Sequence, residues 1–343
     1  MKVTDGRRLA ACLALGLALT AGAGPGETLT RYEFDETHMG SQFHLVLYSP
    51  DASTARRASR AAYDRIAALD AALSDYNPDS ELMRLCDRAG GPPVKVSDDL
   101  FDVLQRAIEM HKRSDGAFDV TVGPVVRLWR RAFRDRQMPA ADRLAEARAL
   151  VGSDKIKLDP QARTIQLLKR GMKLDLGGIA KGYASQAAVD VLKREGIDRA
   201  LCAGAGDIVV SRPPPGKNGW VIGIAPLEAF GVKSARRLLL ANRAVSTAGD
   251  TERFVEIDGK RYSHIVDPRT GLGIVDRASV TVVADDGATA DALDTAVYGL
   301  GPERGLPLVE ATDHAAAFIM RQTPDGLKTY ESARFRTLPT AGE

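Results

Sequence analysis

Apolar residues recur at helical spacing in several stretches of this 343-residue chain. In residues 54–73 they stand three or four positions apart, which places them on one face of a helix. Ser97 and Asp98 are each able to cap a helix that begins beside them. The same periodicity predicts further helices over residues 98–113, 142–150, 180–195 and 291–300.

Shorter apolar stretches have the pattern of strands. Residues 44–48 alternate, and Asp159-Pro160 lies between two short strand-like runs, 156–158 and 164–168, so a hairpin is expected there. Further strands are expected within 200–211 and over 220–225, 234–240, 254–257, 279–284 and 315–321. No repeat or long linker divides the chain. We therefore predict a single domain of the α+β or mixed α/β class, with mixed sheets and flanking helices.

Composition narrows the class of protein. Hydrophobic residues make up 44% and charged residues 27%, which supports a sizeable core and argues against wholesale disorder or a polytopic membrane protein. The 47 basic and 45 acidic residues give a net charge of only +2. Such a balance provides no electrostatic drive toward nucleic acid.

The N-terminus has the pattern of a secretory signal peptide. Lys2, Arg7 and Arg8 precede a short apolar run, which ends at the small residues 21–23. We expect a signal peptide at residues 1–23, an N-terminal segment at 24–37 and an exported, periplasmic protein. The pattern leaves open whether export follows the general or the twin-arginine route, and it does not favour lipidation. Cys86 and Cys202 would remain after cleavage, and we expect two structural thiols.

The first candidate ligand-binding segment, residues 174–183, combines glycines with charged residues. Gly177 and Gly178 end a strand-like run and precede a helix that carries Lys181. Glycines let a ligand approach the backbone, and a helix N-terminus offers free N–H groups to an anion. The spacing does not match a P-loop or a dinucleotide fingerprint. An anion site and an ordinary strand-to-helix turn both remain open.

Asp291 and Thr295 stand four positions apart, so a helix stacks them on one face. A carboxylate and a hydroxyl are oxygen donors suited to Mg²⁺. The alternative is that Asp291 caps its own helix and Thr295 is merely buried. Asp294 lies off this face, and we expect it to be solvated.

A third segment places His264 in a turn with Asp267 and Arg269. The imidazole is able to donate to a phosphate or to act as an acid or base, and a structural histidine is the alternative. Asp250 and Thr251 add polar groups that would converge here. Two further turns carry aromatic residues that would stack on a planar ring or close a local core, one with Phe118 and Asp119 and one with Tyr76.

Taken in order, these segments resemble the ApbE family, the FAD:protein FMN transferases. The resemblance runs from about residue 38 to 301, and it implies an ApbE-like flavin transferase domain over residues 38–335. The matching stretches are residues 39–41, 74–76, 117–124, 174–183, 264–271 and 290–296.

The resemblance implies a Mg²⁺-dependent enzyme that uses FAD as its substrate. It would attach FMN through a phosphoester bond to a Thr or Ser of an exported or membrane redox protein, with release of AMP. The acceptors would carry an Asp-x-x-(Ser/Thr)-Gly-Ala-(Thr/Ser)-like motif. Such partners imply a peripheral association with the inner membrane.

The acceptor hydroxyl needs a proton acceptor, and our hypothesis is that His264 or Asp291 serves. The resemblance also assigns residues. Mg²⁺ would be held by Asp291, Thr295 and the carbonyl of Gly178. The residues expected to contact FAD are Met39, Tyr76, Ala117, Phe118, Asp119, Asp175, Lys181, His264 and Ile265. The chain departs from the family pattern at Ser41, which keeps the usual hydroxyl, and at Ser185-Gln186 and Ala248, where a ligand contact is in doubt.

Two other functions remain open at the level of sequence. An FAD pyrophosphatase would use the same pocket, with water in place of the protein hydroxyl. A periplasmic flavin-binding protein without turnover would need no metal, so the spacing of Asp291 and Thr295 disfavours it. A carbohydrate- or peptide-binding module is disfavoured because two tryptophans are too few for a carbohydrate platform.

Overall fold

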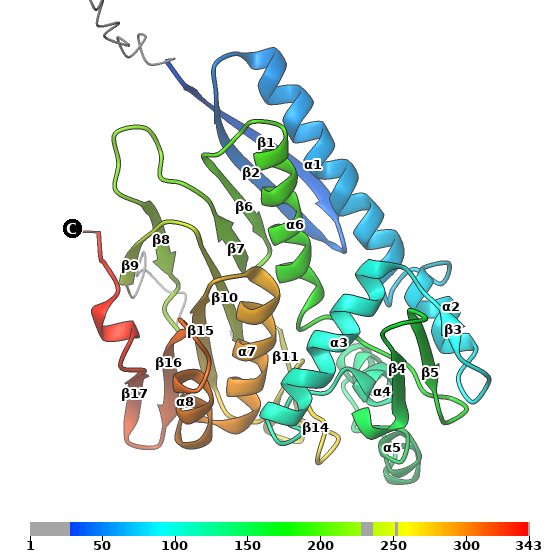
Figure 1. The fold of residues 1–343 in the computed structure, drawn as a ribbon. Helices are drawn as coiled ribbons and strands as arrows, with labels where there is room; N and C mark the ends of the chain where they lie inside the picture. Colours follow the sequence, from blue (N-terminus) through cyan, green and yellow to red (C-terminus); the bar gives the residue numbers. More distant parts are fainter. Residues whose placement is uncertain (1–27, 228–235, 251–252, 342–343) are drawn as a thin grey trace, which may run out of the picture.

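The computed structural model describes residues 28–227, 236–250 and 253–341. Within them, an antiparallel sheet of eight strands forms the centre of the molecule (Figure 1). Its strand order is β1-β2-β6-β7-β10-β15-β16-β17. These strands span Thr30–His38, Ser41–Ser49, Ala200–Gly204, Asp207–Val210, Arg243–Gly249, Ala278–Ala284, Ala316–Thr323 and Gly326–Glu331, in the order of the sheet.

Helices cover one face of this sheet (Figure 1). Helix α6 packs on β6 and β7, α7 packs on β10 and β15, and α1 lies against α6. On β2, the alternate residues Phe43, Leu45 and Leu47 are fully buried under these helices. The helices are α1 (Ala52–Leu73), α2 (Glu81–Asp87), α3 (Asp98–Arg113), α4 (Gly123–Asp135), α5 (Ala141–Arg148), α6 (Ala180–Arg194), α7 (Gly287–Leu300) and α8 (Pro302–Glu310).

The opposite face of the sheet is covered by the hairpin of β8 (Trp220–Ile224) and β9 (Arg236–Leu240). Val46, Val245 and Phe318 point to this side and form a second core with the hairpin. Because both faces are covered, every residue of β15 is buried. This continuous burial explains why residues 279–284 are mostly apolar, with the small polar residues Ser279 and Thr281 also buried.

A smaller lobe completes the domain. There, α4 and α5 pack on the hairpin of β11 (Phe254–Ile257) and β12 (Lys260–Ser263) around Trp129. The other short strands are β3 (Val94–Lys95), β4 (Ile156–Asp159), β5 (Thr164–Leu167), β13 (Val266–Asp267) and β14 (Leu272–Gly273), and the 3-10 turns are η1 (Val120–Val122), η2 (Ser153–Lys155) and η3 (Phe335–Thr337).

The predicted class and most predicted elements are confirmed. Ser97 caps α3, and the hairpin at residue 159 is present. The start of α7 differs, because it begins at Gly287 with Asp286 as its cap rather than at Asp291. The sequence patterns also missed β1, α2, α4 and α8, and the first two residues of the strand expected at 234–240 lie outside the described residues.

The N-terminal predictions fall mostly outside the described part of the chain. Residues 1–23, expected to be a signal peptide, are not described, and β1 lies partly within the expected segment 24–37. Cys86 and Cys202 are buried and free, as expected for structural thiols. Within the described residues, no helix combines the length and apolarity needed to cross a bilayer.

Candidate active site

The candidate site is built where helices α6 and α7 cross. Gly182 and Gly287 face each other there, and a Cβ added to either would lie 2.1 Å from the carbonyl oxygen of the other. The two main chains are therefore in direct contact. This contact brings Asp291 to the first turn of α6, where its Oδ2 accepts a hydrogen bond of 3.0 Å from the Gly182 N–H.

The three residues proposed for the metal lie close together. A Cβ added to Gly178 would lie 3.0 Å from Thr295 Oγ1, so the glycine turn lies against the same face of α7 that carries Asp291. Asp291 does not cap its own helix, because Asp286 accepts the hydrogen bond from the Thr289 N–H. The capping alternative for Asp291 is therefore wrong.

A second layer of carboxylates lies beneath this set. Asp207 begins β7, and its Oδ2 lies 3.6 Å from Lys181 Nζ. Ser246 Oγ lies 2.6 Å from Asp207 Oδ1 and 2.5 Å from Asp294 Oδ2, and its single proton is donated to one of these carboxylates at a time. The prediction that Asp294 is solvated is wrong, since the residue is only 1% exposed. Its Oδ1 has no hydrogen-bond partner among the described residues.

Burial and mutual repulsion change the acidity of these groups. Desolvation, with the nearby Asp207 charge, raises the pKa of Asp291 to about 8. Desolvation and neighbouring carboxylates also raise the pKa of Asp294, and desolvation raises that of Asp207. Burial alone would lower the pKa of Lys181, but the carboxylates of Asp291 and Asp207 raise it. The ammonium therefore stays charged.

The charge balance of this cluster fits a divalent cation. Three buried carboxylates face one ammonium, which leaves two negative charges without a counterion when all groups are ionised. No group of three or more His, Cys, Asp or Glu side chains is arranged to hold a metal in the described residues. The candidate ligands are instead one carboxylate, one hydroxyl and one main-chain carbonyl, all oxygen donors that suit Mg²⁺.

Tyr76 and Asp175 are brought together by a residue that the sequence analysis missed. The Arg130 guanidinium pairs with Asp75 at 2.5 Å and with Asp175 at 3.1 Å, and it stacks 4.1 Å from the centre of the Tyr76 ring. Burial and the Asp175 charge raise the pKa of Asp75 to about 6. Tyr76 as a residue is 70% exposed, so the ring face away from Arg130 is available to a planar ligand.

The loop around Phe118 supports the glycine turn. Phe118 Cε2 would lie 3.3 Å from a Cβ on Gly178, and Ala117 and Phe118 are both buried. Asp119 faces inward, where Thr121 and Ser153 donate to its carboxylate. In this structure the Asp119 side chain is bonded to protein groups. Met39 has a φ of 51° in the β1–β2 turn, and its N–H donates to Asp70.

His264 presents one ring nitrogen as a base. Its Nδ1 lies 3.0 Å from the carbonyl oxygen of Arg253, an acceptor only, so Nδ1 carries the proton and the lone pair of Nε2 has no partner among the described residues. Desolvation by the surrounding protein lowers the pKa of His264, and the charges of Arg253 and Lys181 lower it further. The lowered pKa favours the neutral ring, and the residue is exposed to solvent.

Polar residues predicted to gather around His264 bond to other groups instead. Asp267 pairs with Arg269, which also donates to the Gly299 carbonyl, and Asp250 pairs with Arg261. Ile265 follows His264 and is held by a hydrogen bond from its N–H to Ser263 Oγ. Thr251 lies outside the described residues.

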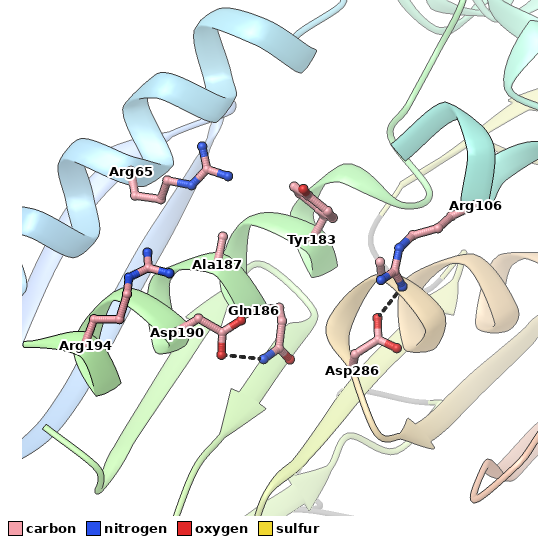
Figure 2. Close-up of a pocket in the computed structure, with 9 residues that line it drawn as sticks. Arg65, Arg106, Tyr183, Gln186, Ala187, Asp190, Arg194 and Asp286 are labelled. Carbon is pink, nitrogen blue, oxygen red and sulfur yellow. Dashed lines mark hydrogen bonds and ion pairs between the residues drawn. The ribbon is translucent and has the colours of Figure 1, made fainter. Parts of the chain in front are cut away.

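A separate hollow lies on the outer side of α6. Its volume is about 260 Å³, and it opens between α1, α3, α6 and the start of α7 (Figure 2). Gln186, one of the departures from the family pattern, lines this hollow and donates to Asp190. None of the predicted site residues lines it.

Comparison with known proteins identifies the family. A model described as the ApbE family matches residues 39–319. The chain belongs to the ApbE family. Two ApbE relatives called FAD:protein FMN transferase, from Klebsiella pneumoniae and Haemophilus influenzae, are each 32% identical to the chain. The alignments cover 90% and 96% of this chain and 95% and 98% of the relatives.

Solved structures agree with this family assignment. The flavin transferase ApbE from Vibrio cholerae superimposes with a TM-score of 0.81 at 28% identity, covering 91% of this chain and 100% of the other. The apo form of the Pseudomonas stutzeri flavinyl transferase ApbE gives a TM-score of 0.80 at 30% identity, covering 92% and 98%. The whole domain is therefore similar to ApbE structures.

Proposed function

We propose that the protein is a Mg²⁺-dependent FAD:protein FMN transferase. The observation that carries this proposal is the contact of α6 with α7, which places Lys181 and the Gly177-Gly178 turn beside Asp291 and Thr295. A helix N-terminus, an ammonium and a divalent-cation site at one place suit a diphosphate. The ApbE relatives named FAD:protein FMN transferase support FAD as the substrate.

FAD would be bound by two parts of this site, the Tyr76 ring and the N-terminus of α6. The exposed ring face of Tyr76, backed by Arg130, suits stacking by a planar ring of the dinucleotide. Lys181 and the first turn of α6 would neutralise the diphosphate. We propose that the loop of Ala117, Phe118 and Asp119 lies beside the bound dinucleotide, with Met39, Asp175 and Ile265 as further contacts.

The bound Mg²⁺ would neutralise the diphosphate and stabilise the charge that develops as AMP leaves. Asp291, Thr295 and the Gly178 carbonyl are the residues proposed to hold it. Their fit rests on their being oxygen donors and on the raised pKa values of Asp291 and Asp294, which reflect too little positive charge nearby to keep both carboxylates ionised. Asp294 Oδ1 also has no hydrogen-bond partner among the described residues.

The transfer step needs a proton acceptor. The oxygen of an acceptor Thr or Ser would form a bond to the FMN phosphorus, while the bond from that phosphorus to the AMP oxygen breaks. His264 Nε2 would take the hydroxyl proton, because its lone pair has no partner among the described residues and the lowered pKa favours the neutral ring. AMP would leave with the electrons of the broken bond.

The site of action is proposed from the N-terminal pattern. A basic, then apolar, then small-residue order at residues 1–23 supports export to the periplasm. The acceptors would then be exported or membrane redox proteins with an Asp-x-x-(Ser/Thr)-Gly-Ala-(Thr/Ser)-like motif. Peripheral association with the inner membrane would follow from binding them.

Mass spectrometry of an acceptor peptide after incubation with FAD and Mg²⁺ tests the proposal. We expect one FMN on a Thr or Ser and an equal amount of AMP, and loss of both with a chelator or with Asp291→Asn. Free FMN and AMP, formed equally without peptide, would instead establish an FAD pyrophosphatase. Tight FAD binding without AMP would establish a binding protein.

A further inference from the structure

Asp207 is a buried carboxylate that the proposed chemistry does not use. It begins β7, and its side chain is only 5% exposed. One oxygen accepts from Ser246 at 2.6 Å, and the other lies 3.6 Å from Lys181 Nζ. Both oxygens are thus committed to protein groups, so the carboxylate acts on a ligand only through another side chain.

Lys181 is held from two sides. Its ammonium donates to the Gly177 carbonyl at 2.9 Å. On the other side it faces the carboxylate of Asp207, which lies on β7 of the central sheet. A lysine side chain has a flexible four-carbon stem, and an unanchored ammonium samples many rotamers. Asp207 therefore restricts Lys181 to the position above the glycine turn before any ligand binds.

Ser246 connects Asp207 to α7, the helix that carries the proposed metal ligands Asp291 and Thr295. The hydroxyl on β10 bridges Asp207 and Asp294, at 2.6 and 2.5 Å. Asp294 precedes Thr295 on α7, so one hydroxyl links the lysine anchor to the helix that carries Asp291 and Thr295. The link fixes the spacing between the ammonium and the proposed cation site, which is the spacing that a diphosphate must match.

We infer that Asp207, braced by Ser246, is a positioning residue that orients Lys181 for the FAD diphosphate. This inference rests on the proposed function for the identity of the ligand. In this role the carboxylate would touch neither substrate nor metal, and its effect would reach FAD only through the Lys181 ammonium.

A double-mutant cycle with Lys181 tests the inference. FAD affinity is measured by flavin fluorescence in the presence of a chelator, so the readout does not depend on turnover. We expect Asp207→Asn, which keeps the shape of the side chain, to weaken FAD binding about tenfold. In a Lys181→Met background the same change should have no effect, because the group that Asp207 positions is absent.

Steady-state kinetics and a control variant sharpen the result. Asp207→Asn should raise the KM for FAD more than it lowers kcat. Ser246→Ala should show the same dependence on Lys181 with a smaller loss, and it replaces Asp207→Asn if that variant does not fold. Ser211→Ala removes a buried hydroxyl just beyond the other end of β7 and should leave FAD binding unchanged.

Equal losses with and without Lys181, or wild-type affinity in both Asp207→Asn and Ser246→Ala, would overturn the inference. Wild-type protein that binds FAD but transfers nothing to a peptide would overturn the proposed function and leave the cycle measurable. Wild-type protein that does not bind FAD would overturn both.

Discussion

His264 illustrates what a single residue contributes. Its Nε2 is the free base because Nδ1 faces a carbonyl oxygen. We expect His264→Ala to lower the rate of FMN transfer about 10²–10⁴-fold, the usual contribution of a general base. FAD affinity should stay close to that of the wild type. Single-turnover transfer to a peptide, with FAD titration alongside, measures both.

The matched control is His314→Ala. This histidine is exposed, pairs with Asp285 and follows α8, so its loss should leave the transfer rate unchanged. Transfer at the wild-type rate by the His264 variant would remove that residue from the role of base.

The proposed role of Asp291 as a metal ligand predicts that Mg²⁺ binding depends on pH. Because its pKa is raised to about 8, a proton competes with the cation at lower pH. We expect Mg²⁺ affinity to rise as the pH increases toward about 8 and then to level off, with proton release on binding. Calorimetric titrations in buffers of different ionisation enthalpy measure the release. Affinity that is independent of pH would contradict this assignment.

Only part of the site could be predicted from local sequence. The Asp291–Thr295 pair follows from helical spacing, a local rule. The partners of the other groups come from distant segments, since Asp294 meets Ser246 48 positions away and Arg130 meets Asp175 45 positions away. Helical spacing alone places Asp294 off the Asp291–Thr295 face and therefore predicts that it is solvated. Its burial comes from contact with Ser246 on β10, a strand distant in sequence.

At the scale of elements, the crossing of α6 and α7 controls the geometry of the site. We expect Gly182→Ala to destabilise the fold by about 1–3 kcal/mol, because the added Cβ overlaps the Gly287 carbonyl and forces the helices apart. Mg²⁺ affinity should fall with it, since Asp291 would lose the Gly182 N–H. Denaturant unfolding and metal titration measure the two effects.

A matched change on the same helix separates crowding at the crossing from a general effect on α6. Ala187→Ser adds one atom at a half-buried position away from α7, and it should alter stability by no more than about 0.5 kcal/mol. Equal losses for the two variants would show that the crossing is not the sensitive point.

Element boundaries show why prediction from pattern is incomplete. The first turn of α7 contains Gly287, a poor helix former, so the apolar periodicity indicated a later start. Strand β1 was missed because residues 24–37 were assigned to an N-terminal segment outside the domain, although Arg31, Glu33 and Asp35 alternate with Tyr32 and Phe34 as in a strand. It is a strand because its backbone pairs with β2 along nine residues, a contact that residue type alone does not reveal.

At the scale of the whole molecule, export is the property to test. We expect protein recovered from the periplasm to begin at Gly24, because the small residues at 21–23 suit signal peptidase. Intact mass measurement of the exported protein checks the cleavage point. A chain that keeps residue 1 and stays in the cytoplasm would refute the predicted signal peptide.

The two buried thiols have a consequence for where the protein is able to fold. Cys86 Sγ accepts a hydrogen bond from the Leu174 N–H, and Cys202 lies in strand β6 of the main sheet. Neither cysteine forms a disulfide. The described core is therefore complete without any sulfur–sulfur bond. An exported form of the protein, as proposed, would need no oxidant to complete this part of its core.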